Sequence, residues 1–274
     1  MPSPLPIAVL LSGEGTTLDA IARAIDAGEL PARIVVVLSD RPRAPGLERA
    51  RRRGLPTEVF PRDAPPGSDW SAAVDAVLRD RRAELVVLAG FLSVLPAPLL
   101  ARWPGRVVNV HPSLLPRFGG PGMYGLRVHA AVLAAGETVS GATVHVVTEA
   151  VDAGPVLLSA PVPVRPDDTP ETLRERVRPV ERALVVEAIR RFATREWPLP
   201  YVSPGGPGSA GGRPRDPAGR SAPGGPARGP PSGGAGARGR ACGASSWADR
   251  GGPRARAGPR RPSRSTGRSS TGRA

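Results

Sequence analysis

Asn109 and His111 lie two residues apart at the end of a valine-rich stretch, and their side chains suit chemistry at a carbonyl group. An imidazole can carry a proton near neutral pH, and a carboxamide can donate a hydrogen bond to a developing oxyanion. Because side chains alternate along a strand, residues two apart project from the same face of a sheet. Pro112 and Pro116 then fix the direction of the chain. The alternative is that both polar side chains only cap the end of a strand.

Asp152 is the third candidate, in the sequence "EAVDAGPVL" at residues 149–157. A carboxylate beside a histidine raises the pKa of the imidazole and can order a water molecule. The same spacing is typical of an ordinary turn aspartate before Gly154 and Pro155. On spacing alone, both interpretations stay open.

The remaining histidines and the one cysteine do not extend this set. His145 alternates with Val144 and Val146 and is predicted to be structural or to support a site residue, and His129 falls on a helical pattern and is predicted to be structural. Three scattered histidines without cysteine neighbours have no metal-ligand spacing, so no metal site is expected. Cys242 lies far beyond the candidate residues, which excludes thiol catalysis among them and a disulfide framework.

A glycine-rich turn, "LSGEGTTLDAI" at residues 11–21, follows the first apolar run. Gly13 and Gly15 would let backbone N–H groups approach an anion. Thr16 and Thr17 can cap the following helix, whose N-terminus favours a phosphate. The dinucleotide glycine spacing and a Gly-Lys-Ser/Thr ending are both absent, so we expect a phosphate monoester rather than a nucleotide. The alternative is a turn that only tightens a strand-to-helix connection.

Valine-rich apolar runs alternate with helical patterns in the part of the chain that carries these residues. This rhythm predicts a parallel sheet with helices on both faces, in which sites form at the carboxyl ends of the strands. The last two strands are separated only by a turn, which predicts an antiparallel edge. The predicted fold class is α/β, a Rossmann-like, mostly parallel sheet with an antiparallel C-terminal edge. The expected strands are residues 7–12, 33–40, 55–60, 84–90, 106–110, 141–147 and 156–164, and the expected helices are residues 16–28, 46–54, 69–81 and 171–192.

Composition divides the chain near residue 202. Residues 1–202 hold 24 Arg and 22 acidic residues, a net charge of +2, whereas residues 203–274 hold 14 Arg and 2 Asp, a net charge of +12. The second part is nearly all Gly, Pro, Arg, Ser and Ala, with too few apolar residues to offset the entropy of ordering. We therefore expect one domain over residues 1–202 and a disordered tail over residues 203–274. Three interpretations of the tail remain open: a solvated extension, an arm that binds RNA weakly, or an out-of-frame extension of a GC-rich gene.

No stretch of the sequence predicts a membrane span or a secretory signal. The apolar start "PIAVLLSG" at residues 6–13 is too short for a secretory apolar region and lacks a basic start. We expect a cytoplasmic protein that acts on small molecules as a monomer or homodimer. No specific nucleic-acid partner and no membrane partner are expected.

Together these motifs resemble the phosphoribosylglycinamide formyltransferase family, folate-dependent enzymes of purine synthesis. The resemblance covers residues 6–195, and the Asn, His and Asp set with "HPSLLP" is typical of formyltransferases, while the first loop narrows it to the glycinamide branch. It implies transfer of the formyl group of 10-formyltetrahydrofolate, as co-substrate, to the amine of 5'-phosphoribosylglycinamide. The matching motifs are "SGEGTTL", "LERARRRGLPT", "VVLAGFLSVL", "NVHPSLLPRF" and "GATVHVVTEAVDAGPVLL", followed by the closing helix.

The resemblance also implies roles for individual residues. Asn109 and His111 would stabilise the oxyanion, and Asp152 would keep the imidazole charged, as in the family's catalytic triad. The residues implied to bind phosphoribosylglycinamide are Gly13, Glu14, Gly15, Thr16 and Thr17, at the phosphate, and Glu181, at the ribose. The residues implied to bind the folate are Leu92, Ser93, Val94, Leu95 and Asn109.

Three segments depart from the family pattern. Glu14 stands in the first loop where Asn is common, and a carboxylate beside a phosphate is unfavourable unless it points away. Ser93 stands where a basic residue is frequent in some members. The segment "FGGPGMYGLRVH" at residues 118–129 is longer and richer in glycine than the usual turn, so we expect a different lid on the folate side.

Three other functions fit part of the pattern. Hydrolysis of 10-formyltetrahydrofolate would use the same triad with water as the acceptor. Enzymes of that branch usually carry an extra small domain before the catalytic one, whereas the first strand here starts near residue 6. Formyl transfer to initiator tRNA would need a folded C-terminal RNA-binding domain, which residues 203–274 are not expected to form. A nucleic-acid binder that uses the arginine-rich tail would leave the polar residues without a role.

Overall fold

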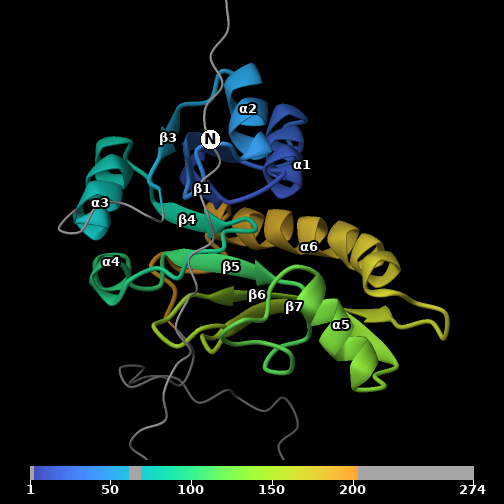
Figure 1. The fold of residues 1–274 in the computed structure, drawn as a ribbon. Helices are drawn as coiled ribbons and strands as arrows, with labels where there is room; N and C mark the ends of the chain where they lie inside the picture. Colours follow the sequence, from blue (N-terminus) through green and yellow to red (C-terminus); the bar gives the residue numbers. More distant parts are fainter. Residues whose placement is uncertain (1–2, 62–68, 203–274) are drawn as a thin grey trace, which may run out of the picture. The chain divides into compact units, whose positions relative to one another are not determined.

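The described part of the chain forms one seven-stranded sheet. The computed structural model describes residues 3–61 and 69–202, so the tail predicted at residues 203–274 lies outside the described residues. The strand order is β3-β2-β1-β4-β5-β6-β7 (Figure 1). The strands are β1 (Leu5–Leu11), β2 (Ala32–Ser39), β3 (Thr57–Val59), β4 (Leu85–Leu88), β5 (Val107–His111), β6 (Val139–Val146) and β7 (Val156–Pro163).

The direction of the strands confirms the predicted fold class. Strands β1 to β5 pair in parallel, whereas β6 is antiparallel to both β5 and β7. Every residue of β1 is buried, as expected for a central strand covered on both faces. In β7, exposed and partly buried residues predominate, which suits a strand at the edge of the sheet.

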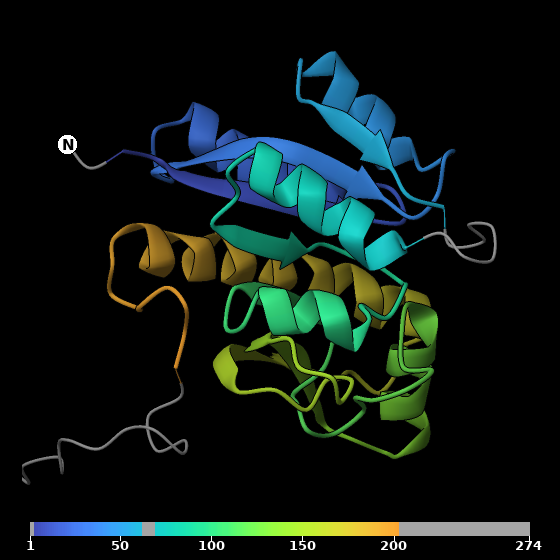
Figure 2. The same cartoon turned by 90° about the vertical axis from the view of Figure 1, so that its left-hand side faces the viewer.

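Helices cover both faces of the sheet (Figures 1 and 2). Helices α1, α2 and α6 bury apolar residues in the core on one face, and α3 and α4 do so on the other. Helix α5 packs with α6 against the β6 and β7 end. The helices are α1 (Thr16–Asp26), α2 (Pro45–Arg52), α3 (Trp70–Asp80), α4 (Ala97–Arg102), α5 (Leu126–Ala134) and α6 (Pro170–Ala193).

Several elements differ from the sequence prediction: helix α5 was anticipated only as a helical pattern around His129, and strand β6 begins two residues earlier than predicted. Helix α4 was not predicted, because six residues that begin after Pro96 give too short a pattern to recognise. Strand β4 ends at Leu88, two residues earlier than predicted, and the chain turns away at Gly90 with a φ of 71°. This early turn directs the segment after β4 along the edge of the sheet where the strands end.

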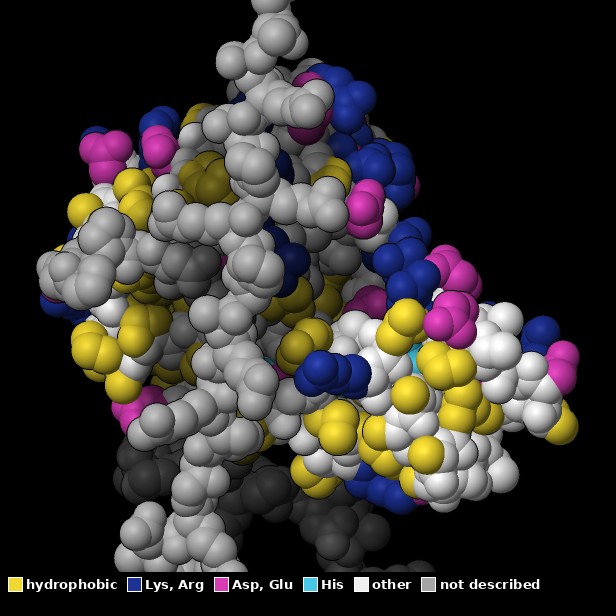
Figure 3. Space-filling model, viewed as in Figure 1, with side chains coloured by type: hydrophobic (Ala, Val, Ile, Leu, Met, Phe, Trp, Pro, Cys, Tyr) yellow, Lys and Arg dark blue, Asp and Glu magenta, His cyan; other side chains and the backbone are white. Residues whose placement is uncertain are grey.

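Basic side chains gather over α1 and α2 on the face shown in Figure 3. Arg49 Nη1 lies 2.8 Å from Asp19 Oδ2, and Arg53 Nη1 lies 2.9 Å from Asp26 Oδ2. These pairs join the end of α2 to α1, so both arginines are engaged within the domain. Over residues 3–61 and 69–202, no helix is both long and apolar enough to cross a membrane.

Candidate active site

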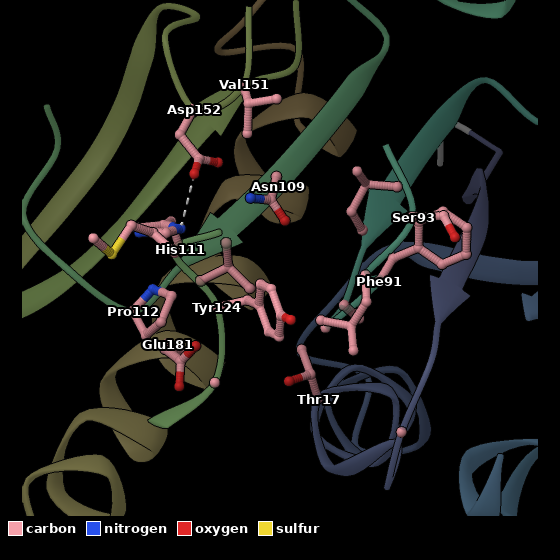
Figure 4. Close-up of a pocket in the computed structure, with 18 of the residues that line it drawn as sticks. Thr17, Phe91, Ser93, Asn109, His111, Pro112, Tyr124, Val151, Asp152 and Glu181 are labelled. Carbon is pink, nitrogen blue, oxygen red and sulfur yellow. Dashed lines mark ion pairs between the residues drawn. The ribbon is translucent and has the colours of Figure 1, made fainter. Parts of the chain in front are cut away.

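A cavity of about 610 Å³ opens at the carboxyl ends of β1, β4 and β5 (Figure 4). Its volume is in the range of pockets that hold small-molecule ligands. Asn109 and His111 reach it from the end of β5, and Asp152 reaches it from the turn between β6 and β7. The other residues predicted for the site also line it, namely Gly13, Glu14, Gly15, Thr16, Thr17, Leu92, Ser93, Val94, Leu95 and Glu181.

His111 is held between two oxygen atoms. The residue is buried, its Nε2 lies 2.8 Å from the backbone oxygen of Phe118, and its Nδ1 lies 3.4 Å from Asp152 Oδ2. The dashed line in Figure 4 marks the contact with Asp152. The same Asp152 oxygen accepts a hydrogen bond of 3.0 Å from the backbone N–H of Gly120. Because both ring nitrogens face acceptors, the surroundings of His111 fit an imidazolium that donates twice.

Burial and charge act in opposite directions on the pKa of His111. Burial has the largest effect and lowers the pKa below its ordinary value, while Asp152 and the Phe118 carbonyl raise it. Asp152 does raise the pKa of His111, as expected, but the effect of burial is larger. The net shift of this pKa is therefore downward.

The pKa of Asp152 is also shifted. Burial would raise this pKa, but the hydrogen bond with His145 and the charge of His111 bring it below its ordinary value. Asp152 is therefore ionised at neutral pH and can stabilise a proton on His111.

His145 joins Asn109 to Asp152. Its Nε2 lies 3.1 Å from Asn109 Nδ2 and 3.5 Å from Asp152 Oδ1, and its Nδ1 lies 3.1 Å from the backbone oxygen of Val146. His145 stands directly opposite Asn109 in the antiparallel pairing of β5 and β6. The sequence predicted only a structural or supporting histidine here, because this register joins residues that are far apart in the chain.

The glycine turn after β1 forms one wall of the cavity. Gly15 has a φ of 73°, and a Cβ there would lie 2.7 Å from Gly46 Cα, so this position requires glycine. A Cβ at Gly13 would meet no atom within 4 Å, so backbone at this position is open to a ligand. Helix α1 begins at Thr16, and its first N–H groups lack partners within the helix, as an anion site requires. The Glu14 side chain is exposed.

Glu181 reaches the cavity from α6, between two arginines. It is half-buried, and Arg178 and Arg182 line the same cavity. Burial raises the pKa of Glu181 to about 7, although both arginines lower it. In Figure 4 the carboxyl group lies near Pro112, on the side of the cavity away from Ser93. A carboxylate there can accept hydrogen bonds from two hydroxyl groups of a sugar.

The segment after β4 forms the more apolar wall. Ser12 Oγ accepts a 2.8 Å hydrogen bond from the backbone N–H of Leu92, which ties this segment to the end of β1. Val94 is 67% exposed, whereas Leu95 is buried in the core beside it. The hydroxyl of Ser93 donates to Asp40 Oδ2 at 2.6 Å, so it is already engaged within the domain.

Several lining residues were not predicted from the sequence. Arg41, Tyr124, His129 and Arg178 all line the cavity. Arg41 follows β2 and Tyr124 precedes α5, and neither belongs to a motif with a chemical signature. His129 was predicted to be structural, and it is indeed a buried residue of α5, yet its Nδ1 has no hydrogen-bond partner. In the described segments, no group of three His, Cys, Asp or Glu side chains is arranged to hold a metal ion.

Comparison with known proteins places this geometry in a family. Residues 5–189 match the family described as formyl transferase. The chloroplastic phosphoribosylglycinamide formyltransferase of Arabidopsis thaliana is 39% identical over 204 residues, which cover 72% of this chain and 70% of that protein. The glycinamide ribonucleotide transformylase 1 structure from Symbiobacterium toebii is 42% identical, with a TM-score of 0.66, covering 71% of this chain and 90% of that chain.

Some relatives are much longer. The trifunctional purine biosynthetic protein adenosine-3 of Gallus gallus is 40% identical over 189 residues, which cover 69% of this chain but only 18% of that protein. The chain thus spans less than a fifth of this relative. The family match nevertheless includes β1 to β7 and the site residues on them. The chain belongs to the formyl transferase family.

Proposed function

We propose that this chain transfers the formyl group of 10-formyltetrahydrofolate to the amine of 5'-phosphoribosylglycinamide, giving formylglycinamide ribonucleotide and tetrahydrofolate in purine synthesis. The observation that carries the proposal is one cavity with Asn109, His111 and Asp152 between two different walls. The glycine turn and Glu181 suit a phosphorylated ribose, and the apolar segment after β4 suits a flat folate ring. The names of the relatives support phosphoribosylglycinamide as the acceptor of the formyl group.

In this reaction the amine attacks the formyl carbon, and negative charge develops on the formyl oxygen. Asn109 would donate a hydrogen bond to that oxygen, and the positive charge of a protonated His111, whose two N–H groups face Asp152 and the Phe118 carbonyl, would stabilise it electrostatically. Asp152 stabilises the positive charge on His111 and can accept a proton from the attacking amine through a water molecule. That proton then passes to the folate nitrogen as its bond to the formyl carbon breaks and tetrahydrofolate leaves. No step requires a metal ion.

His145 would orient the carboxamide of Asn109. Its Nδ1 faces the Val146 carbonyl and donates to it, so in the neutral ring Nε2 accepts from the Asn109 amide. A proton on Nε2, shared with Asp152, would instead face Asn109 Oδ1 and turn the amide N–H groups toward the cavity. In the first arrangement the second N–H of the carboxamide can still donate to an oxyanion, and in the second arrangement both N–H groups can.

An assay with the full chain tests the function. The protein is incubated with 10-formyltetrahydrofolate and phosphoribosylglycinamide, and formylated ribonucleotide and formate are measured by mass spectrometry. We expect formylated ribonucleotide that depends on both substrates. Formate released at the same rate without the glycinamide would instead support hydrolysis of the folate, the alternative in which water is the acceptor.

Gly13→Val should raise the KM for phosphoribosylglycinamide by about tenfold or more and leave the KM for the folate within about twofold. A Cβ at this position would meet no atom within 4 Å, so a side chain can leave the backbone without a clash while it blocks the approach of a phosphate. Steady-state kinetics with each substrate varied in turn measure both constants. Gly13→Ala is the graded control, with a smaller effect in the same direction. A parallel loss of both affinities would show that the turn is structural.

We also propose that residues 1–202 are sufficient for the reaction. The family match ends at residue 189, and every lining residue of the cavity lies before residue 183. A chain truncated after Val202 should keep its circular dichroism spectrum and its kcat within about twofold of the full chain, because its core is complete. A folded but inactive truncated chain would contradict this boundary.

The cellular setting is a further proposal. We propose that the protein acts in the cytoplasm, as a monomer or a homodimer, on small molecules that diffuse to the cavity. Cell fractionation measures the location, and light scattering during size-exclusion chromatography measures the oligomeric state.

A further inference from the structure

The loop before α5 is built to hold one aromatic side chain at the cavity. Gly120, Gly122 and Gly125 have φ values of 95°, 85° and 58°, and a Cβ at any of them would meet no atom within 4 Å. Their backbone conformation, rather than crowding, therefore requires glycine. The backbone N–H of Gly120 is also fixed by Asp152. The loop is thus anchored at the catalytic carboxylate and presents Tyr124 a few residues later.

Tyr124 has an aromatic ring supported from one side and a hydroxyl group without an assigned partner. The residue is 45% exposed although it lines the cavity, and the guanidinium of Arg127 lies 5.0 Å from the centre of its ring. No hydrogen bond to the hydroxyl occurs within the described residues. In Figure 4 the ring extends from the loop across the cavity, toward the side on which Thr17 lies.

We propose that the Tyr124 hydroxyl donates a hydrogen bond to the phosphate of the phosphoribosyl substrate, and so selects phosphorylated over unphosphorylated acceptors. The inference rests on the proposed function, because it names a further contact to the same substrate. A phosphate monoester has three terminal oxygens, and the backbone around Gly13 and the start of α1 approach it from one wall only. Tyr124 supplies a donor from the opposite wall.

The position of Tyr124 favours the phosphate over the folate. In Figure 4 the hydroxyl end of the Tyr124 ring extends toward Thr17, a residue assigned to the phosphate, whereas Glu181, assigned to the ribose, lies on the other side of the ring near Pro112. The cation–π contact with Arg127 holds the ring without occupying its hydroxyl. The glycine-rich loop would therefore contribute Tyr124 to the binding of the phosphoribosyl substrate.

Tyr124→Phe separates this role from a packing role, because it removes only the hydroxyl. With phosphoribosylglycinamide, we expect KM to rise about tenfold, as for loss of a hydrogen bond to a charged group, with kcat and the KM for 10-formyltetrahydrofolate within about twofold. With the dephosphorylated glycinamide riboside, wild type and variant should have the same kcat/KM. Tyr201→Phe is the matched control: Tyr201 packs against Phe192 and Trp197, away from the cavity, and should change neither constant.

The outcomes distinguish this inference from the proposed function. Equal losses with both acceptors, or no loss with the phosphorylated one, would overturn the role of Tyr124 while formyl transfer by the wild type stands. A raised KM for the folate alone would show that the ring contacts the folate instead. Titration calorimetry with ribose 5-phosphate needs no formyl transfer, and Tyr124→Phe should weaken that binding about tenfold. Unchanged binding of ribose 5-phosphate would overturn the inference even if the wild type proved inactive as a transferase.

Discussion

Replacing His111 by alanine should lower kcat for formyl transfer by about a hundredfold or more, which corresponds to about 2.7 kcal/mol of lost transition-state stabilisation. The positive charge of the imidazolium would stabilise the formyl oxygen, and its two N–H contacts, with the Phe118 carbonyl and Asp152, hold the ring in place. The KM for phosphoribosylglycinamide should change by less than about threefold, because the charge that His111 stabilises exists only in the transition state. Steady-state kinetics at saturating folate measure both constants.

Asn109→Ala should have a loss of similar size, and the double variant tests whether the two residues act together. Because both side chains would serve one oxyanion, the double variant should lose much less than the product of the two single effects. Multiplicative losses would show that Asn109 and His111 act on separate steps. This cycle needs no knowledge of the absolute contribution of either residue.

A buried polar residue outside the cavity provides the control. Asp75 on α3 is buried and accepts hydrogen bonds from Trp103 at 2.8 Å and from Arg79 at 3.0 Å. Asp75→Asn should lower Tm, since it weakens these contacts, and leave kcat within about twofold.

If His111→Ala keeps near-full kcat, the histidine only caps a strand and the proposed chemistry is wrong.

Asp152→Asn should also lower kcat by about tenfold to a hundredfold and shift the pH profile. Asp152 raises the pKa of His111, and burial lowers it. Removing the negative charge leaves burial less opposed, so the pKa of His111 falls further. If the reaction needs the protonated ring, activity is lost as pH rises through that pKa. The alkaline limb of the kcat profile should therefore move to lower pH in the variant.

The amide of the variant preserves much of the local structure, which makes the comparison informative. One oxygen remains to accept the hydrogen bond from Gly120, so the loop before α5 should stay anchored. Thermal unfolding and the KM for phosphoribosylglycinamide report on that loop. A limb that moves to higher pH, or does not move while kcat falls, would assign Asp152 to orienting the ring or a water rather than to stabilising its charge.

Local patterns were sufficient to predict the architecture. Each parallel strand is a short valine-rich run, and each long helix repeats its apolar residues at the helical period, so strand, helix and strand could be read without knowledge of their packing. Helix α4 was not predicted, because its six residues after a proline show too little helical periodicity. The boundaries of β4 and β6 shifted by about two residues because pairing with neighbours, rather than local sequence, decides where a strand ends.

The candidate residues followed from their types and spacing, but their mutual contacts did not. Asn109 and His111 share a face because strands alternate, and this was visible in five residues of sequence. The contact of Asp152 with His111 and the bridge through His145 depend on the pairing of β5 with β6, which joins residues 36 positions apart. The net fall in the pKa of His111 depends on its burial by the surrounding residues. The position of Tyr124 depends on the backbone angles of three glycines in the loop before α5. Periodicity is a property of neighbouring residues, whereas register, burial and the direction of a loop arise only when distant segments pack.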